Sequence, residues 1–258
     1  MMRYRITLSY DGSGFSGWQI QPNGPSIQES LQKALSTLLK EEISVTGAGR
    51  TDAGVNAINY VAHFDAARAF DTAAIGYKIN AMMPPGIIVH GISETSPDFN
   101  SRFNAESREY MYFLNRKKDP FAERFSYRFT YPLDVEAMNK AASYILGTRD
   151  FSCFEKTGGN NKTSICTVTE ASWKSYTPDH VRLMGYPSGE DYLVFTVRAD
   201  RFLRNMVRAI VGTLLEIGRG KHDPQWMKEV LDSHDRCAAG DSVPGHALFL
   251  TEIKYKDK

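Results

Sequence analysis

Cysteine is scarce in this sequence, and its pattern argues against a fold held by disulfides or zinc. Cys153, Cys166 and Cys237 are odd in number and show no C-x-x-C spacing, so neither a disulfide framework nor a zinc knuckle is indicated. The six histidines include no H-x-x-x-H or H-E-x-x-H pair, the spacings that place two metal ligands on one helix face. We therefore expect buried structural thiols and no metal.

Long apolar runs are also missing. No stretch approaches the roughly 18 consecutive apolar residues of a membrane helix, and residues 1–10 lack the apolar centre of a signal peptide. The hydrophobic content of 42% is nevertheless enough for one large core or two smaller ones. The sequence predicts a globular, cytoplasmic protein with no membrane segment.

An excess of charge of either sign is absent, since the net charge of the chain is only +1. This value by itself disfavours a nucleic-acid partner, because phosphate binding usually needs surplus lysine and arginine. The charge is unevenly distributed, however: residues 101–130 carry a net +3 and residues 198–221 a net +4, which leaves −6 for the rest. Such polarity allows a basic face for a phosphate-rich ligand, although charge clusters also occur on ordinary solvated surfaces.

No complete nucleotide-binding motif is present. Gly12-x-Gly14-x-x-Gly17 matches the glycines of a dinucleotide fingerprint, but residues 18–25 contain two prolines and no helical periodicity, whereas the fingerprint must open a helix. The glycine-rich run 47–54 lacks the Gly-Lys-Ser/Thr of a P-loop. Dinucleotide binding and nucleotide hydrolysis are therefore unsupported.

Hydrophobic periodicity divides the chain into two similar halves, residues 1–100 and 101–258. In the first half we predict helices from Ser26 to about Lys40 and over 72–83, and strands at 3–10, 43–46, 58–64 and 87–94. In the second half we predict helices at 135–146 and 203–217, and strands at 108–115, 167–176, 192–199 and 247–255. The order β-α-β-β-α-β recurs, which predicts an α+β fold of two ferredoxin-like halves with joined antiparallel sheets and a central cleft.

The run Gly47-Ala48-Gly49-Arg50-Thr51-Asp52-Ala53-Gly54 is the most distinctive local pattern. It places an arginine and a carboxylate on a short loop whose glycines allow a ligand to approach the backbone closely. An aspartate that follows a threonine in such a loop can instead serve only to bind nearby backbone N–H groups. The loop by itself does not decide between these two roles.

The same loop belongs to a series of sequence blocks that extends over nearly the whole chain. The blocks are Tyr10-Asp11-Gly12, Gly17-Trp18-Gln19, Ser26-Ile27-Gln28-Glu29, Gly49-Arg50-Thr51-Asp52-Ala53-Gly54-Val55, Arg108-x-Tyr110-x-Tyr112, Asp150-Phe151, Phe202-Leu203-x-x-Met206-Val207-Arg208 and Leu248-x-Leu250. In content and order they resemble the TruA-type tRNA pseudouridine synthases. The resemblance implies a cofactor-free isomerase that acts as a homodimer on the anticodon stem-loop of tRNA, at positions 38, 39 and 40, and that holds the RNA in the central cleft.

The resemblance also implies roles for five residues. Asp52 would be catalytic, and the guanidinium of Arg208 would orient its carboxylate. Arg50 would contact the RNA backbone or occupy the space of an extruded base, Tyr110 would stack on the flipped uracil, and Leu248 would flank it. Packing within a strand remains the alternative role for Tyr110, and a solvent-facing position the alternative for Arg208.

Pseudouridine formation breaks the N-glycosidic bond of a uridine and rejoins the uracil through carbon. Glycosidases need two carboxylates because one must protonate a poor leaving group, but uracil leaves as a resonance-stabilised anion, so one carboxylate can suffice. Asp52 would attack the ribose C1′, attack the base, or remove the C2′ proton in a glycal route. The sequence leaves these three routes open.

Three positions depart from the family pattern. Asn56 stands where the family usually has histidine, so no imidazole is present there. Ala247 replaces a common glycine, and residues 164–166 lie where an arginine-containing segment is usual. These changes concern fine substrate contacts and leave the expected reaction unchanged.

A non-catalytic RNA-binding module is the main alternative, because ferredoxin-like sheets also form RRM domains. No strand carries the Lys/Arg-Gly-Phe/Tyr-Gly/Ala-Phe pattern of such a module, and the Arg-Thr-Asp loop has no obvious purpose in simple base stacking. A small-molecule α+β enzyme is a third class, which failure to bind tRNA at low salt would favour.

Overall fold

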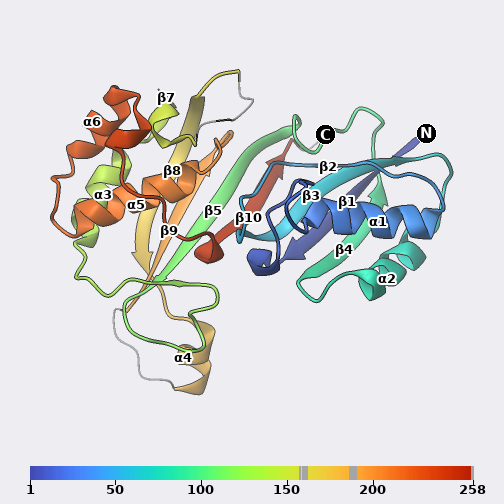
Figure 1. The fold of residues 1–258 in the computed structure, drawn as a ribbon, viewed down its shortest axis with the longest axis horizontal. Helices are drawn as coiled ribbons and strands as arrows, with labels where there is room; N and C mark the ends of the chain where they lie inside the picture. The colour runs from blue at the N-terminus through green and yellow to red at the C-terminus, as the bar shows by residue number, and fades with distance from the viewer. Residues whose placement is uncertain (157, 159–161, 186–190, 257–258) are drawn as a thin grey trace. The chain divides into compact units, whose positions relative to one another are not determined.

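The computed structural model describes residues 1–156, 158, 162–185 and 191–256, and the chain divides into two compact units. The first comprises Met1–Arg108 and Phe249–Lys258, and the second comprises Glu109–Leu248. Each unit combines helices with a mostly antiparallel sheet (Figure 1), so the fold class is α+β, as predicted. Among the helices of the described residues, none is long and apolar enough to cross a membrane.

The sheet of the first unit has the order β4-β1-β3, with β2 paired to β3 as well. Its antiparallel strands are β1 (Met2–Tyr10), β2 (Val45–Gly47), β3 (Asn56–Ala66) and β4 (Ile87–Glu94). Near the end of the chain, β10 (Leu248–Tyr255) pairs in parallel with the start of β3, where Phe249 lies opposite Asn56 and Leu250 opposite Ala57. The start of β3 is therefore held by a segment almost 200 residues away in sequence.

Two helices cover the sheet of the first unit. The first, α1 (Ile27–Leu39), begins where the Ser26 hydroxyl accepts a hydrogen bond from the backbone N–H of Glu29, and it ends at Lys40 in the left-handed conformation. The second, α2 (Thr72–Met82), is capped by the Asp71 carboxylate. α1 packs next to β2, α2 packs against β4, and the two helices contact each other (Figure 1).

The sheet of the second unit has the order β5-β9-β8-β7, with the short β6 beside β5. Its strands are β5 (Ala105–Asn115), β6 (Tyr127–Arg128), β7 (Gly147–Asp150), β8 (Ile165–Ser175) and β9 (Tyr192–Ala199). Its helices are α3 (Val135–Ser143), α4 (Asp179–Met184), α5 (Met206–Gly218) and α6 (Trp226–Ser233). α3 packs on β8, and α3, α5 and α6 contact one another.

Helix α5 forms the centre of the second unit and is buried on most of its surface. Gly212 lies so close to the chain at Asp241 that a Cβ added to it would overlap the Asp241 carbonyl oxygen. Thr213 donates its hydroxyl proton to the Ala209 carbonyl and accepts the N–H of Gly240 at 2.9 Å. These contacts hold the segment that leads toward β10 against α5.

Seven predicted strands and helices have ends that differ from those of the structure by one to three residues, and β6, β7, α4 and α6 were not predicted. Three further expectations need correction. Strand β2 begins at Val45 and not at residue 43, because its pairing with β3 starts at Val45 opposite Phe64, and the N–H of Ile43 is bound by the Ser36 hydroxyl of α1. Helix α5 begins at Met206 and not at residue 203, because Asn205 has a left-handed backbone with φ of 67°. Cys153 and Cys166 are buried as expected, but Cys237 is exposed on a short 3-10 turn.

The helical glycines provide a test of this packing. We expect Gly212→Ala to destabilise the protein by about 1–3 kcal/mol, because its methyl group meets backbone that must shift. Gly76→Ala on α2 is the matched control: its Cβ would have no neighbour within 4 Å, so the change should be neutral or stabilise by about 0.5–1 kcal/mol. Urea unfolding of both variants measures the difference, and equal stabilities would contradict the packing described for α5.

Candidate active site

The loop between β2 and β3 carries two of the five expected site residues. Arg50 is exposed to solvent, Thr51 is buried, and Asp52 is half-buried. The backbone carbonyl of Asp52 accepts a hydrogen bond from the N–H of Val55 at 3.1 Å, which closes a turn. The loop therefore presents a carboxylate from a defined turn, with an arginine two residues before it.

The segment that follows β1 supports this loop from one side. The hydroxyl groups of Tyr10 and Thr51 lie 2.9 Å apart in a buried hydrogen bond. The N–H of Trp18 donates to the carbonyl of Thr51 at 3.2 Å, and the N–H of Gly54 donates to the carbonyl of Phe15 at 3.4 Å. Three hydrogen bonds thus join residues 10–18 to the residues on both sides of Asp52.

Two glycines allow these segments to approach so closely. A Cβ on Gly12 would overlap the carbonyl oxygen of Val55, and a Cβ on Gly17 would overlap that of Thr51. Gly17 also has φ of 100°, a conformation that favours glycine. Two of the three glycines that resemble a dinucleotide fingerprint in the sequence, Gly12 and Gly17, are therefore required for packing against the Asp52 loop, whereas a Cβ on Gly14 would meet nothing within 4 Å.

Asn56 adds a side-chain contact between the same segments. It is the first residue of β3, it is 1% exposed, and its Oδ1 accepts the backbone N–H of Gly12 at 2.9 Å. The resemblance described in the sequence analysis implies a histidine at this position. The amide therefore has a clear structural partner in this chain.

The other side of the loop is held by Tyr60 and Arg108. The Tyr60 hydroxyl bonds to the backbone carbonyl of Gly49 and accepts the N–H of the same residue, while its ring stacks on Trp18 with 4.2 Å between centroids. The Nη2 of Arg108 donates to the carbonyl of Ala48 at 3.0 Å. The loop is thus supported at both ends, which favours one fixed conformation.

Tyr110 and Tyr112 occupy different environments on β5 of the second unit. Tyr112 is fully buried, donates its hydroxyl proton to the carbonyl of Pro244 at 3.1 Å, and has its pKa raised by burial. Tyr110 is half-buried, and its ring makes an edge contact with Phe202 at 5.0 Å between centroids. Tyr112 is therefore a packing residue, whereas Tyr110 keeps part of its surface accessible.

Arg208 and Leu248 also belong to the second unit. The half-buried Arg208 on α5 donates from Nε to the carbonyl of Val243 at 2.7 Å, and the N–H of Val243 donates to the carbonyl of Arg208 at 3.2 Å. Leu248 is 4% exposed and begins β10. Arg208 is thus not a simple solvent-facing arginine, because it holds the segment that leads to Leu248.

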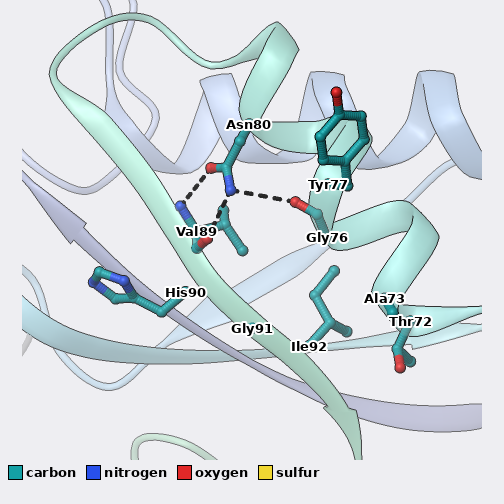
Figure 2. Close-up of a pocket in the computed structure, with 9 residues that line it drawn as sticks. All are labelled: Thr72, Ala73, Gly76, Tyr77, Asn80, Val89, His90, Gly91 and Ile92. Carbon is teal, nitrogen blue, oxygen red and sulfur yellow. Dashed lines mark hydrogen bonds between the residues drawn. The ribbon is translucent and has the colours of Figure 1, made fainter.

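A surface pocket of the first unit lies elsewhere, between α2 and β4 (Figure 2). Asn80 points into it and forms two hydrogen bonds of 2.8 Å with the backbone of Val89, one as donor and one as acceptor. Tyr77 and His90 also line it. None of the five expected site residues contributes to this pocket.

Sequence reasoning missed the supporting residues of the Asp52 loop. It included Tyr10, Trp18 and Arg108 in the family blocks but gave them no role, and it treated Asn56 only as a departure from the pattern. Tyr60 was part of a predicted strand. The available signal was the occurrence of polar aromatic residues beside closely spaced glycines, which indicates tightly packed loops.

Comparison with known proteins gives a consistent assignment. A family model described as tRNA pseudouridine synthase matches residues 141–256. The protein named tRNA pseudouridine synthase A of Bacteroides thetaiotaomicron is 48% identical over 258 residues, which is 100% of this chain and 92% of that protein. The protein of the same name from Bacteroides fragilis is 45% identical (99% of this chain, 97% of that protein), and tRNA pseudouridine synthase A 2 of Clostridium perfringens is 38% identical (99% and 100%). With this identity over its full length, the chain belongs to the tRNA pseudouridine synthase family.

Proposed function

We propose that this protein is an isomerase that converts uridine to pseudouridine at positions 38, 39 and 40 in the anticodon stem-loop of tRNA. The observation that carries the proposal is the match over the whole chain to relatives named tRNA pseudouridine synthase A. The preformed loop around Asp52 supports it, because a reaction with one essential carboxylate needs that group in a fixed position. A tRNA substrate would place the enzyme in the cytoplasm.

Asp52 is the proposed catalytic residue. Its carboxylate is half-buried on a turn that hydrogen bonds and glycine contacts hold in place, so little reorganisation is needed when the substrate arrives. The net reaction consumes no water and needs no redox cofactor. Attack on C1′, attack on the base and removal of the C2′ proton all use an ionised carboxylate, and all three remain compatible with this geometry.

Four further residues complete the proposed site. Arg50 is exposed and is suited to contact phosphate or fill the space of an extruded base. Tyr110 has the accessible ring needed for stacking on the uracil, which Tyr112 lacks. Arg208 would orient the Asp52 carboxylate, and Leu248 would provide an apolar contact to the base.

We also propose the finer architecture that the sequence predicts, with two ferredoxin-like halves at 1–100 and 101–258, joined sheets and a central RNA-binding cleft. In its support, the first unit has the antiparallel strand order β4-β1-β3-β2, with helices α1 and α2 as the crossover connections. A homodimer would extend the surface for a substrate as large as tRNA. The basic segments 101–130 and 198–221 would then supply most of the phosphate contacts.

Asp52→Ala tests the proposed reaction. We expect the wild-type protein to release tritium from C5-labelled uridine in unmodified tRNA, and we expect the variant to release none, because the proposed reaction depends on the carboxylate of Asp52. Binding of tRNA by the variant, measured by filter retention, should persist. Equal release by both proteins would refute the role of Asp52, and binding without release by either would indicate a non-catalytic RNA-binding module.

Arg50→Ala tests the proposed RNA contact. Because Arg50 is exposed, the change should leave the melting temperature unchanged. It should lower kcat/KM for tRNA about tenfold and reduce the number of counterions released on tRNA binding by about one. Arg68→Ala is the matched control, since Arg68 is another exposed arginine of the first unit. The same loss in both variants would show that only general charge is involved.

A further inference from the structure

We propose that Asn56 is a positioning residue for Asp52 and acts through the backbone of Gly12. The inference rests on the proposed function, because it concerns the geometry of the catalytic loop. Asn56 directly follows the turn formed by Asp52 and Val55. Its buried Oδ1 accepts the N–H of Gly12 at 2.9 Å.

A short series of contacts links this hydrogen bond to Asp52. Gly12 packs so closely on the carbonyl of Val55 that no Cβ fits between them. Val55 in turn donates its N–H to the carbonyl of Asp52 at 3.1 Å. A shift of Gly12 therefore changes the position of Val55, and with it the turn that carries the carboxylate.

The amide oxygen of Asn56 holds the N–H of Gly12, while the carbonyl of Gly86 holds the N–H of the preceding Asp11 at 2.9 Å. A buried N–H without an acceptor is unfavourable, so removal of the Asn56 acceptor favours movement of Gly12 toward water. The other contacts of the loop, from Tyr10, Trp18 and Phe15, hold Thr51 and Gly54. Asn56 is therefore the side chain that fixes the Gly12 end of the supporting segment.

The proposed requirement is for a hydrogen-bond acceptor attached to the γ carbon. The Nδ1 of a neutral histidine is also attached to Cγ and can accept a hydrogen bond, as can a carboxylate oxygen of aspartate. Leucine has a similar shape but no acceptor. Substitutions of similar size at position 56 can therefore be compared by whether they provide a hydrogen-bond acceptor.

The experiment compares Asn56→Leu, Asn56→His and Asn80→Ala. Tritium release from unmodified tRNA gives kcat and KM, and thermal unfolding gives stability. We expect Asn56→Leu to lower kcat about 10- to 100-fold, the effect of misplacing a catalytic group by a fraction of an ångström to an ångström, with little change in KM. Asn56→His should recover most of the wild-type kcat. If Asn56→Leu does not fold, Asn56→Ser provides the same comparison, because its shorter side chain does not reach the Gly12 N–H.

Asn80 is the matched control because it makes the same kind of contact in the same unit. Its amide forms two hydrogen bonds with the backbone of Val89 beside the pocket in Figure 2. Asn80→Ala should therefore lower stability but leave kcat unchanged at temperatures where the protein is folded. A similar loss of kcat in Asn80→Ala would show that Asn56 has only a structural role, and it would overturn the inference.

The outcomes separate the inference from the proposed function. Undiminished kcat in a folded Asn56→Leu protein overturns the inference alone, provided that the wild type releases tritium. Failure of Asn56→His to restore kcat also overturns it, because an acceptor would then not be sufficient. Absence of release from the wild-type protein overturns the proposed function and, with it, the inference.

Discussion

Gly12 and Gly17 pack against the carbonyl groups of Val55 and Thr51 without room for a Cβ atom, and the geometry of the candidate site depends on this contact. Only when the two segments lie this close can the N–H of Trp18 reach Thr51 and the N–H of Gly12 reach Asn56. These bonds then fix the residues on both sides of Asp52. Catalysis by a single carboxylate benefits from such preorganisation, because little conformational freedom remains to be lost when the substrate binds.

Elements with a strong local signal could be predicted from the sequence. Strands β4 and β9 have the predicted bounds, and α1 begins at the Ser26 cap and ends at Lys40 as expected. Alternation along a strand and a cap at the start of a helix are properties of a few neighbouring residues, so one sequence is enough to recognise them. The family could also be predicted, because its sequence blocks extend over the whole chain in order.

Features that depend on contacts distant in sequence could not be predicted. The start of β2 depends on its pairing with β3 and on the Ser36 side chain of α1, and the parallel pairing of β10 with β3 has no local pattern. Tyr110 and Tyr112 share a face of one strand, and they are distinguished by contacts distant in sequence, with Phe202 for Tyr110 and with the carbonyl of Pro244 for Tyr112. Asn56 was recognised as a departure from the family pattern, but its partner Gly12 lies 44 residues earlier in the sequence.

The position of β10 has a consequence for the order in which the protein forms during its synthesis. Residues 249–258 belong to the first unit, yet the ribosome makes them only after the whole second unit. The nascent first unit therefore leaves the start of β3, including Asn56, without the strand that later pairs with it. Until residues 249 and 250 have been made, the strand that directly follows the candidate catalytic loop therefore lacks one of its neighbours.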